Sequence, residues 1–511
     1  MLDLFLQGFT NVLSPFCLLL MIVGTIVGII FGAVPGLSSV MAIALFLPLT
    51  YGMDPGQGLS ILIALYIGSV SGGLISAILL KIPGTPASIA TCFDGHPMLG
   101  KGEGAKALGA GVLFSFIGTI LSVIALMFMA PTVANVAIKF GPHEFFSIAV
   151  LSLMLIATLS SGSMVKGIFA GIMGIAFGTV GIAPVDATMR YTFGTVALSD
   201  GFDILTVMIG LFAVSEVIAI AEVAKKMKAE EVAKVDMKVK GFGFSMKEFV
   251  QQIPNTIRAA LVGLGIGILP GIGAGTSNLV AYTVNKNADK KHGEEYGKGY
   301  IGGIVASETA NNASVGGALI PLMTLGIPGD GVTALLLGAF MVHGIAPGPL
   351  LFTNYGPLVY TIFAACIVAT FMMLIFEWFG MRVFAKILKV PRHILLPIVF
   401  VLCVVGAFGL SGRIFDVVAV IIFGAIGYFF VKFKIPQAPF VIGFVLGGMA
   451  ETNLRRGLMM SDGKFSGFFT NPISGVILSF TIIYLIIIMI KMIRKSKTTV
   501  KAVGTIVKTA A

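Results

Sequence analysis

Long apolar runs recur along the whole chain, and they restrict its possible folds more than any other feature. Examples cover residues 12–32, 108–130, 203–221, 355–376 and 474–490. Runs of this length span a hydrocarbon layer of about 30 Å when they are helical. They are continuously apolar instead of alternating every second residue, which favours helices over a β-barrel. The sequence therefore predicts an all-α polytopic membrane protein.

The composition excludes a soluble globular protein. Of the 511 residues, 57% are hydrophobic and 11% are charged, whereas soluble domains are charged at about a quarter of their positions. The start of the chain has no basic segment before its first apolar run, so no cleaved signal peptide is expected. For a bilayer of ordinary thickness, we expect about 12 membrane-crossing or re-entrant elements.

The net charge of +11 is concentrated beside the ends of apolar runs. Lys and Arg gather in residues 221–249 and 491–508, and such clusters lie in the cytoplasm by the positive-inside rule. This placement gives no support for a nucleic-acid partner. The four cysteines lack metal-ligand spacing, so neither a metal site nor a disulfide framework is expected. The predicted organisation is a first transmembrane repeat over 1–222, a basic cytoplasmic linker over 223–248, a second transmembrane repeat over 249–490 and a basic cytoplasmic tail over 491–511.

Two pairs of proline-glycine motifs relate the two halves of the chain. "FGAVPGLSS" at 31–39 corresponds to "IGILPGIGA" at 266–274, and "KIPGTPAS" at 81–88 corresponds to "GIPGDGVT" at 326–333. The prolines of a pair are 48 residues apart in the first half and 58 in the second, where a polar insertion at 285–299 accounts for the excess. This order indicates an internal repeat.

Each motif is expected to break a helix inside the membrane. A break frees backbone groups that lipid cannot satisfy, so it persists only against protein or a water-filled cavity. Interrupted helices at matching places in two halves are typical of the central site of a transporter, and the halves are then commonly inverted. The alternative is that the motifs are ordinary proline kinks or turns at the membrane edge.

Four longer stretches carry a family resemblance. They read "GAVPGLSS", "GSVSGGLISAILLKIPGTPASIATCFDGHPMLGKGEGAKALG", "GILPGIGAGTSN" and "ASETANNASVGGALIPLMTLGIPGDGVTALLLGAF". They resemble the large membrane subunit of the tripartite tricarboxylate transporters, the TctA family, over about residues 10–490. The resemblance implies a secondary transporter that imports di- or tricarboxylates, such as citrate, across the bacterial cytoplasmic (inner) membrane.

The resemblance also implies the partners and the driving force. In that family the large permease subunit works with a small four-span membrane subunit and a periplasmic solute-binding protein. Transport is driven by a cation gradient, with Na⁺ or H⁺ as the coupling ion and no other cofactor. A homodimer is left open.

The helix starts that follow the four breaks are the predicted substrate site, because their free N–H groups and dipoles attract carboxylates. Thr85 is expected to cap a helix that begins at Pro86. The predicted substrate-binding residues are Pro35, Gly36, Ser38, Ser39, Pro83, Gly84, Thr85, Pro86, Ser88, Gly271, Gly273, Gly275, Thr276, Ser277, Asn278, Pro328, Gly329 and Thr333.

A carboxylate in an apolar segment indicates a cation site. Glu308 lies in such a segment, and Asn311 and Asn312 follow it by three and four residues, on the same helical face. Their oxygens suit a hard cation, although Glu308 could instead only tie two helices together. Asp330 is also assigned to cation coupling: it is expected to cap a helix, and to serve the cation, accept a proton or pair with Lys81.

The sequence has no motif of an enzyme. Walker, zinc-helix and nucleophile-elbow signatures are missing from it, so neither an ATP-driven pump nor an intramembrane hydrolase is predicted. The alternatives to carboxylate symport are an ion channel and a transporter for a different small organic anion. Saturable flux that follows a cation gradient would distinguish a transporter from a channel.

Overall fold

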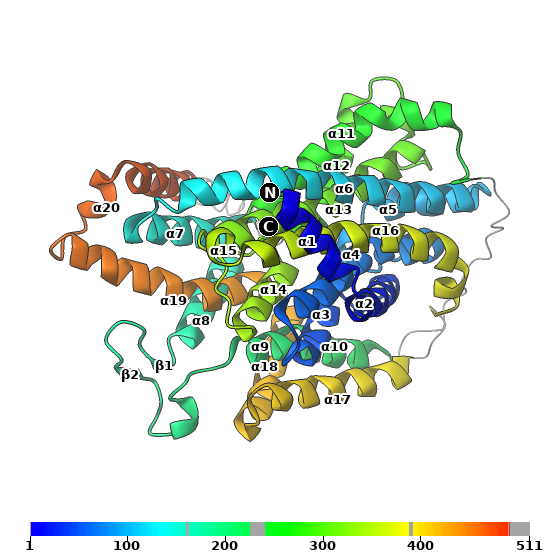
Figure 1. Ribbon diagram of the computed structural model, residues 1–511. Coiled ribbons are helices and arrows are strands. Elements are labelled where there is room, and N and C mark those ends of the chain that lie inside the picture. The colour runs from blue at the N-terminus through cyan, green and yellow to red at the C-terminus, as the bar shows by residue number, and fades with distance from the viewer. Residues whose placement is uncertain (1, 160–162, 225–240, 388–391, 489, 491–511) are drawn as a thin grey trace, which may run out of the picture.

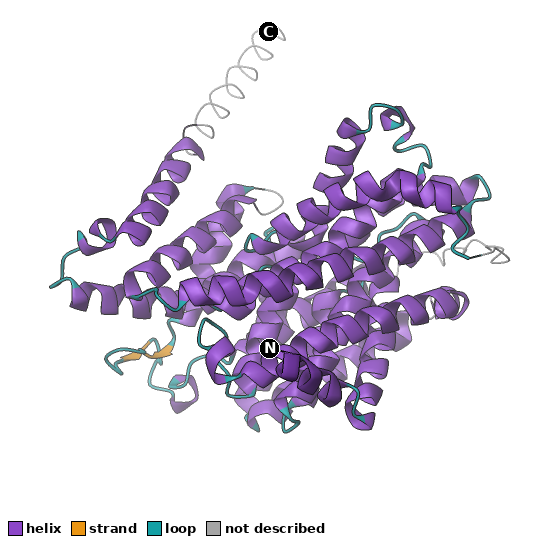
Figure 2. Cartoon of the chain, turned by 45° about the horizontal axis from the view of Figure 1, so that its top comes forward, coloured by secondary structure: helices purple, strands orange, loops and turns teal. Residues whose placement is uncertain are grey.

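The protein is nearly all helix in a computed structural model (Figures 1 and 2). The structure describes residues 2–159, 163–224, 241–387, 392–488 and 490. Most of the predicted basic linker and the predicted tail at 491–511 lie outside the described residues.

The first half contains ten α-helices, several short turns of other helix types and one small antiparallel hairpin. The α-helices are α1 (Leu2–Val12), α2 (Pro15–Ala33), α3 (Ser39–Phe46), α4 (Pro55–Leu80), α5 (Thr91–Gly100), α6 (Gly104–Ala137), α7 (Pro142–Leu159), α8 (Met164–Gly178), α9 (Ile204–Met208) and α10 (Ser215–Ala224). The other elements are the 3₁₀ turns η1 (Leu47–Thr50), η2 (Pro86–Ser88) and η3 (Val196–Leu198), the π-helical η4 (Ile209–Val214), and strands β1 (Gly181–Ile182) and β2 (Met189–Arg190).

The second half consists of helices joined by turns and loops, with no strand among its described residues. Its elements are α11 (Met246–Ile268), α12 (Gly273–Ala288), η5 (Gly293–Glu295), α13 (Ile301–Leu325), α14 (Gly331–Val342), α15 (Leu351–Asn354), α16 (Gly356–Ile387), α17 (Arg392–Ser411), α18 (Ile414–Lys432), α19 (Gln437–Met460) and α20 (Gly467–Thr470). A last apolar helix covers Pro472–Ile488.

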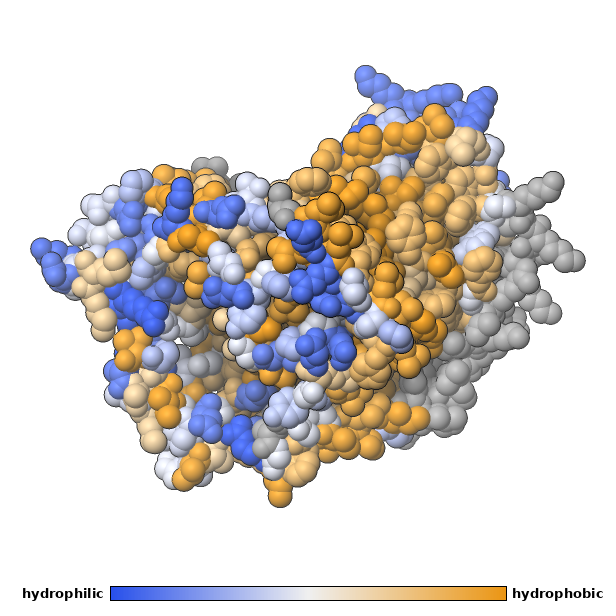
Figure 3. Space-filling view, viewed as in Figure 1, coloured by the Kyte–Doolittle hydropathy of each residue, from blue (hydrophilic) through white to orange (hydrophobic). Residues whose placement is uncertain are grey.

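The prediction of a polytopic membrane protein is confirmed. Within the described residues, six helices are long and apolar enough to cross a membrane: Pro15–Ala33, Pro55–Leu80, Gly104–Ala137, Ile204–Glu222, Gly356–Met381 and Ile414–Lys432. A further six apolar helices are shorter, and the predicted run at 474–490 belongs to these. Figure 3 shows a broad apolar expanse on the right of the visible face, with hydrophilic residues across its centre and left and at its upper projection.

Glycines let the central helices pack backbone to backbone. In α2, a Cβ atom added at Gly28 would lie 2.5 Å from the carbonyl oxygen of Leu65, and Gly32 lies against Ser69 in the same way. In α11, Gly263 and Gly267 pack against α13. Small residues allow this close approach inside a membrane, where helices gain little from hydrophobic burial against each other.

The contacts also define the directions of the helices. The packing of Gly28 and Gly32 along α4 makes α2 and α4 parallel, and α11 and α13 are parallel by the same test. Phe116 packs on Phe371 while Met127 shares a pocket with Phe363, so α6 and α16 are antiparallel.

Two further pairs of helices relate the directions of the two halves. Helix α16 runs parallel to α4, because Gly56 faces Thr361 and Ser71 bonds Glu377. Helix α13 runs parallel to α6, because Ser115 bonds Glu308 and Thr119 bonds Asn312. The α2–α4 pair therefore runs opposite to the α11–α13 pair.

All four proline-glycine motifs end a helix, and they are not kinks within one. The chain turns at each motif into a new element: α3, η2, α12 and α14. Gly36 has φ +93° and Gly271 has φ +77°, values that favour glycine. The predicted helix start is present, with Thr85 at the N-cap position and Pro86 first, but it is a single 3₁₀ turn, η2, and the α-helix begins at Thr91.

Candidate functional site

The segment after the second break, residues 83–88, lies against the second half of the chain; we call it the first-half tip. Asn278 of α12 donates through Nδ2 to the carbonyl oxygen of Pro86 at 3.0 Å and also to that of Ala87. Asn311 of α13 donates to the oxygen of Ala87 at 2.8 Å. Amide side chains of α12 and α13 thus bond carbonyl groups of the tip that have no partner within a helix.

Glu308 is fully buried beside this tip, in a cluster of hydrogen-bond donors. Its carboxylate accepts from the Thr91 hydroxyl, from Ser115 Oγ at 3.0 Å and from Asn311 Nδ2 at 3.1 Å. Asn312 donates to the Glu308 backbone oxygen at 3.1 Å and to Asn311 Oδ1 at 2.5 Å. The predicted grouping of Glu308 with the two asparagines is present, with the first-half tip attached to it.

The segment after the fourth break, residues 328–333, is the second-half tip, and it lies against the first half. Asp330 caps α14, as its Oδ1 accepts from the Thr333 backbone N–H at 2.7 Å. Its Oδ2 accepts from the Tyr66 hydroxyl at 2.7 Å. Gly271 donates through its backbone to the oxygen of Gly329 at 2.7 Å, which joins the third and fourth breaks.

The predicted cap at Asp330 is present, whereas its predicted pairing with Lys81 is not found among the described residues. Asp330 lies at the second-half tip, and its bonds go to Tyr66 and Thr333, not to the Glu308 cluster. Lys81 is exposed, with φ +60°, at the C-terminal end of α4. No ion pair joins it to Asp330 in the described residues. Their parallel positions in the sequence therefore do not bring them together.

Most of the predicted hydroxyl ligands bond to nearby backbone. Ser38 accepts from the Met41 N–H at 3.1 Å. Ser88 donates to the Thr85 oxygen at 3.0 Å, and Ser277 donates to the oxygen of Ala274, also at 3.0 Å. These side chains shape the helix starts, which leaves the backbone N–H groups as the anion-attracting feature there.

Two buried polar atoms at the first-half tip have no hydrogen-bond partner in the structure, and a third such atom lies on α13. They are Thr85 Oγ1, Asn278 Oδ1 and Thr309 Oγ1. The predicted capping bond from the Thr85 side chain is therefore not made. Buried polar groups without partners are rare and costly, so these atoms mark a place where a polar ligand would be bonded.

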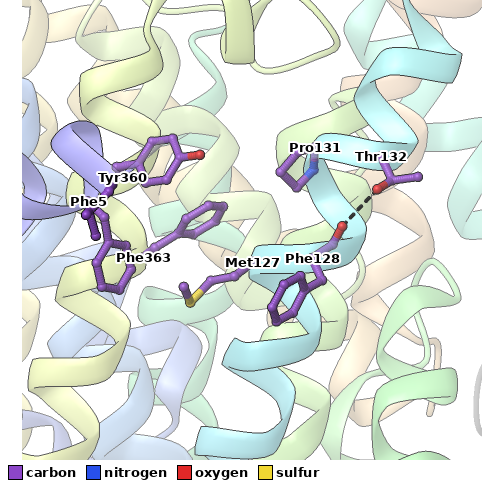
Figure 4. A pocket seen from close by; sticks show the side chains of 8 residues that line it. Phe5, Met127, Phe128, Pro131, Thr132, Tyr360 and Phe363 are labelled. Carbon is purple, nitrogen blue, oxygen red and sulfur yellow. Dashed lines mark hydrogen bonds between the residues drawn. The ribbon is translucent and has the colours of Figure 1, made fainter.

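An apolar pocket lies elsewhere, between α1, α6 and α16 (Figure 4). It has a volume of about 450 Å³ and is lined by Leu2, Phe5, Met127, Phe128, Pro131, Thr132, Tyr360 and Phe363. The lining carries no charged side chain. A multiply charged carboxylate has no counter-charge there, so we place the candidate site at the tips and not in this pocket.

A separate ionic cluster ties the β1–β2 hairpin to α19, outside the spanning segments. Arg455 contacts Asp186 at 2.8 Å and Glu451 at 2.9 Å, and Arg190 contacts Glu451 at 2.7 Å. The Arg455 side chain, helped by Thr188, lowers the pKa of Asp186 to about 2. This cluster anchors a loop and shares no residue with the tips.

Several side chains at the site escaped sequence analysis. Tyr66, Thr91 and Ser115 are ordinary residues in apolar runs, and no local signal distinguishes them. Glu377 is different, because a carboxylate within the spanning segment Gly356–Met381 is itself a sequence signal of a functional site. It follows directly after the predicted run 355–376, so that run does not contain it.

The fold and the tips define a class: a polytopic α-helical membrane protein with paired broken helices around a buried polar centre. Residues 18–442 match the Tripartite tricarboxylate transporter TctA family, and the chain belongs to that family. It is thus a large membrane subunit of a tripartite tricarboxylate transporter, and the predicted resemblance is confirmed.

Two proteins of Agrobacterium vitis are similar to this chain. One, described as an uncharacterized 52.8 kDa protein in the TAR-I ttuC' 3' region, is 33% identical over 96% of both chains. The other, described as an uncharacterized protein in the TAR-II ttuC' 3' region, is 34% identical over 96% of its own length and 45% of this chain. No solved structure matches the chain.

Proposed function

We propose that this chain imports di- or tricarboxylates of the citrate type across the bacterial inner membrane by cation symport, in an alternating-access cycle. The substrate binds between the first-half and second-half tips, and Na⁺ or H⁺ is the coupling ion. The small four-span subunit and the periplasmic solute-binding protein are the partners that family membership implies.

One observation carries the proposal: each tip is bonded to a long helix of the other half. Tyr66 of α4 bonds Asp330 in the second-half tip, and Asn311 of α13 bonds Ala87 in the first-half tip. Tyr66 and Asn311 each lie 17 residues before the Pro of their own half's second motif, since 83 − 66 and 328 − 311 are equal. A movement of one half against the other therefore acts on both tips.

Further paired contacts support an inverted repeat. Val40 packs 3.3 Å from the Cβ position of Gly331, and Pro86 lies 3.1 Å from that of Gly275. Val40 and Gly275 are both five residues after the first Pro of their half, while Pro86 and Gly331 are both three residues after the second. Together with the opposite directions of the α2–α4 and α11–α13 pairs, these contacts support two halves related by a pseudo-two-fold axis in the membrane plane.

The Glu308 cluster is the proposed cation site. An uncompensated intramembrane carboxylate costs several kcal/mol, and Glu308 is stabilised by three side-chain donors. The unpartnered oxygens of Asn278 and Thr309 lie on the helices that surround it. Oxygen-rich sites of this kind suit a hard cation or a proton.

The test is uptake of labelled citrate and other di- and tricarboxylates into proteoliposomes that contain the chain and its small subunit. Binding protein is supplied outside, and Na⁺ and H⁺ gradients are imposed separately. We expect saturable, gradient-dependent uptake that is lost in Glu308→Gln. Absence of uptake for every carboxylate under both gradients would contradict the substrate class, and fast unitary conductance would indicate a channel.

A further inference from the structure

A second buried carboxylate, Glu377, lies on α16 within the spanning segment Gly356–Met381. Its side chain has no exposed surface. Ser71 of α4 donates to its Oε2 at 2.7 Å, and its Oε1 is buried without a hydrogen-bond partner. No ion pair reaches Glu377 from the residues that the structure describes.

Arg382 and Lys386 follow Glu377 on α16, and no described side chain of the neighbouring helices forms an ion pair with it. The ionisable groups on helices packed against α16 are Asp3 of α1, Cys17 of α2, Tyr66 of α4 and Lys106 of α6. Tyr66 is bonded to Asp330, and Lys106 to Glu248 at the start of α11. The ionisable group that interacts electrostatically with Glu377 is another carboxylate, Glu308.

We propose that Glu377 is a proton-binding site of the transport cycle: it carries a proton in the arrangement seen here and releases it when the helices rearrange. The inference rests on the proposed function, because it assigns one coupling ion of that transport. Proton binding converts the carboxylate to the neutral acid, and no other bond changes.

The ligand set favours a proton over a metal cation. Sodium and calcium ions need several oxygen ligands, and Glu377 is offered one hydroxyl, from Ser71. An ionised carboxylate in an apolar interior costs far more than the neutral acid. Glu308 differs, because three donors satisfy its charge. Two carboxylates in such different environments are suited to different roles.

The turn of α4 at residues 71–73 connects Glu377 to the first-half tip. Ser71 faces α16 and bonds Glu377. Two residues later, the Cβ position of Gly73 is 2.9 Å from Ser88 Oγ and 3.0 Å from Thr85 Oγ1. Residues two apart point to well-separated sides of a helix. A shift of this turn on release of the proton would therefore displace the tip that carries the proposed substrate ligands.

The direct test is infrared spectroscopy of the full chain with its small subunit in liposomes, which needs no transport activity. We expect a carbonyl-stretch band of a protonated carboxyl that disappears in Glu377→Gln and shifts in Ser71→Ala. Thr370→Val is the matched control, since Thr370 is buried in the same helix but bonds only its own backbone, at Cys366; it should leave the band unchanged. A band that persists unaltered in Glu377→Gln would overturn the proposal.

In the transport test, the glutamine of Glu377→Gln imitates the neutral, protonated form of the carboxyl group. We expect Glu377→Gln to retain exchange of carboxylate across the membrane and to lose accumulation driven by a H⁺ gradient. Full proton-driven accumulation in this variant would overturn the proposal. If the wild-type chain carries no carboxylate under any gradient, the proposed function fails, while the infrared band still decides whether Glu377 holds a proton.

Discussion

Gly329 in the second-half tip should be intolerant of alanine. A Cβ atom there would lie 2.6 Å from the carbonyl oxygen of Gly267 and 2.8 Å from both Cα and Cβ of Ala318. These atoms belong to packed helices and cannot rotate away. The tip must then move, which strains the bond from Gly271 N–H to the Gly329 oxygen at 2.7 Å.

Two contributions determine the free-energy cost of Gly329→Ala. Overpacking of a tight interior costs about 1–3 kcal/mol, and loss of a backbone hydrogen bond adds about 1 kcal/mol. A total of about 2–4 kcal/mol lowers the population of the packed tip roughly 30- to 1000-fold. We expect Gly329→Ala to unfold at a lower temperature and to lose most uptake.

Thermal unfolding is measurable through the buried cysteines Cys17, Cys92, Cys366 and Cys403, which react with a fluorogenic thiol dye only when the protein opens. The control is Gly265→Ala on α11, where an added Cβ meets no atom within 4 Å and alanine favours the helix by about 1 kcal/mol. Unfolding and uptake of Gly329→Ala equal to those of wild type would refute the packing described for this tip.

Other predictions address the remaining contacts. Glu308→Gln should abolish cation-dependent uptake, because the amide N–H₂ of glutamine would face the hydrogen-bond donors that now bond the carboxylate. Gradient-driven uptake at the wild-type rate would contradict this prediction. Tyr66→Phe and Asp330→Asn should each lower the free energy of unfolding, and a double-mutant cycle should give a coupling of about 1–3 kcal/mol; strictly additive losses would show that the bond is unimportant. The pKa of Asp186 is lowered to about 2 by Arg455, so its stabilisation of the loop is present above the ordinary value of 3.8 and is lost as the pH falls towards about 2. Hydrogen exchange of the loop, corrected for intrinsic rates, should rise over that interval, and Asp186→Asn should not show the rise.

The sequence was sufficient wherever the deciding physics is local. The apolar runs predict membrane helices because burial in lipid depends on each segment's own hydrophobicity. The four breaks were predicted because proline and glycine end helices by their own backbone restrictions. Asp330 was expected to cap a helix, and Ser38 is also observed as a cap. Both caps are local, since each side chain bonds a backbone group three residues away.

Local reasoning failed where a neighbouring element decides the outcome. Thr85 has the features of a cap, but the chain at the first-half tip packs against Asn278 and Asn311, and only a single 3₁₀ turn forms there. Lys81 was considered as a partner of Asp330 on their parallel positions. In the structure Lys81 is exposed at the end of α4, whereas Asp330 accepts a hydrogen bond from Tyr66.

The sequence by itself determined the membrane class, the positions of the breaks and one ionisable residue, Glu308. The tertiary structure decided which side chains meet. Tyr66 and Asp330 are 264 residues apart in the chain, and Ser71 and Glu377 are 306 apart. Whether a buried carboxylate is surrounded by donors, like Glu308, or left with one hydroxyl, like Glu377, depends on which helix faces pack together. That packing is a property of the assembled helices, so no single segment of the sequence encodes it.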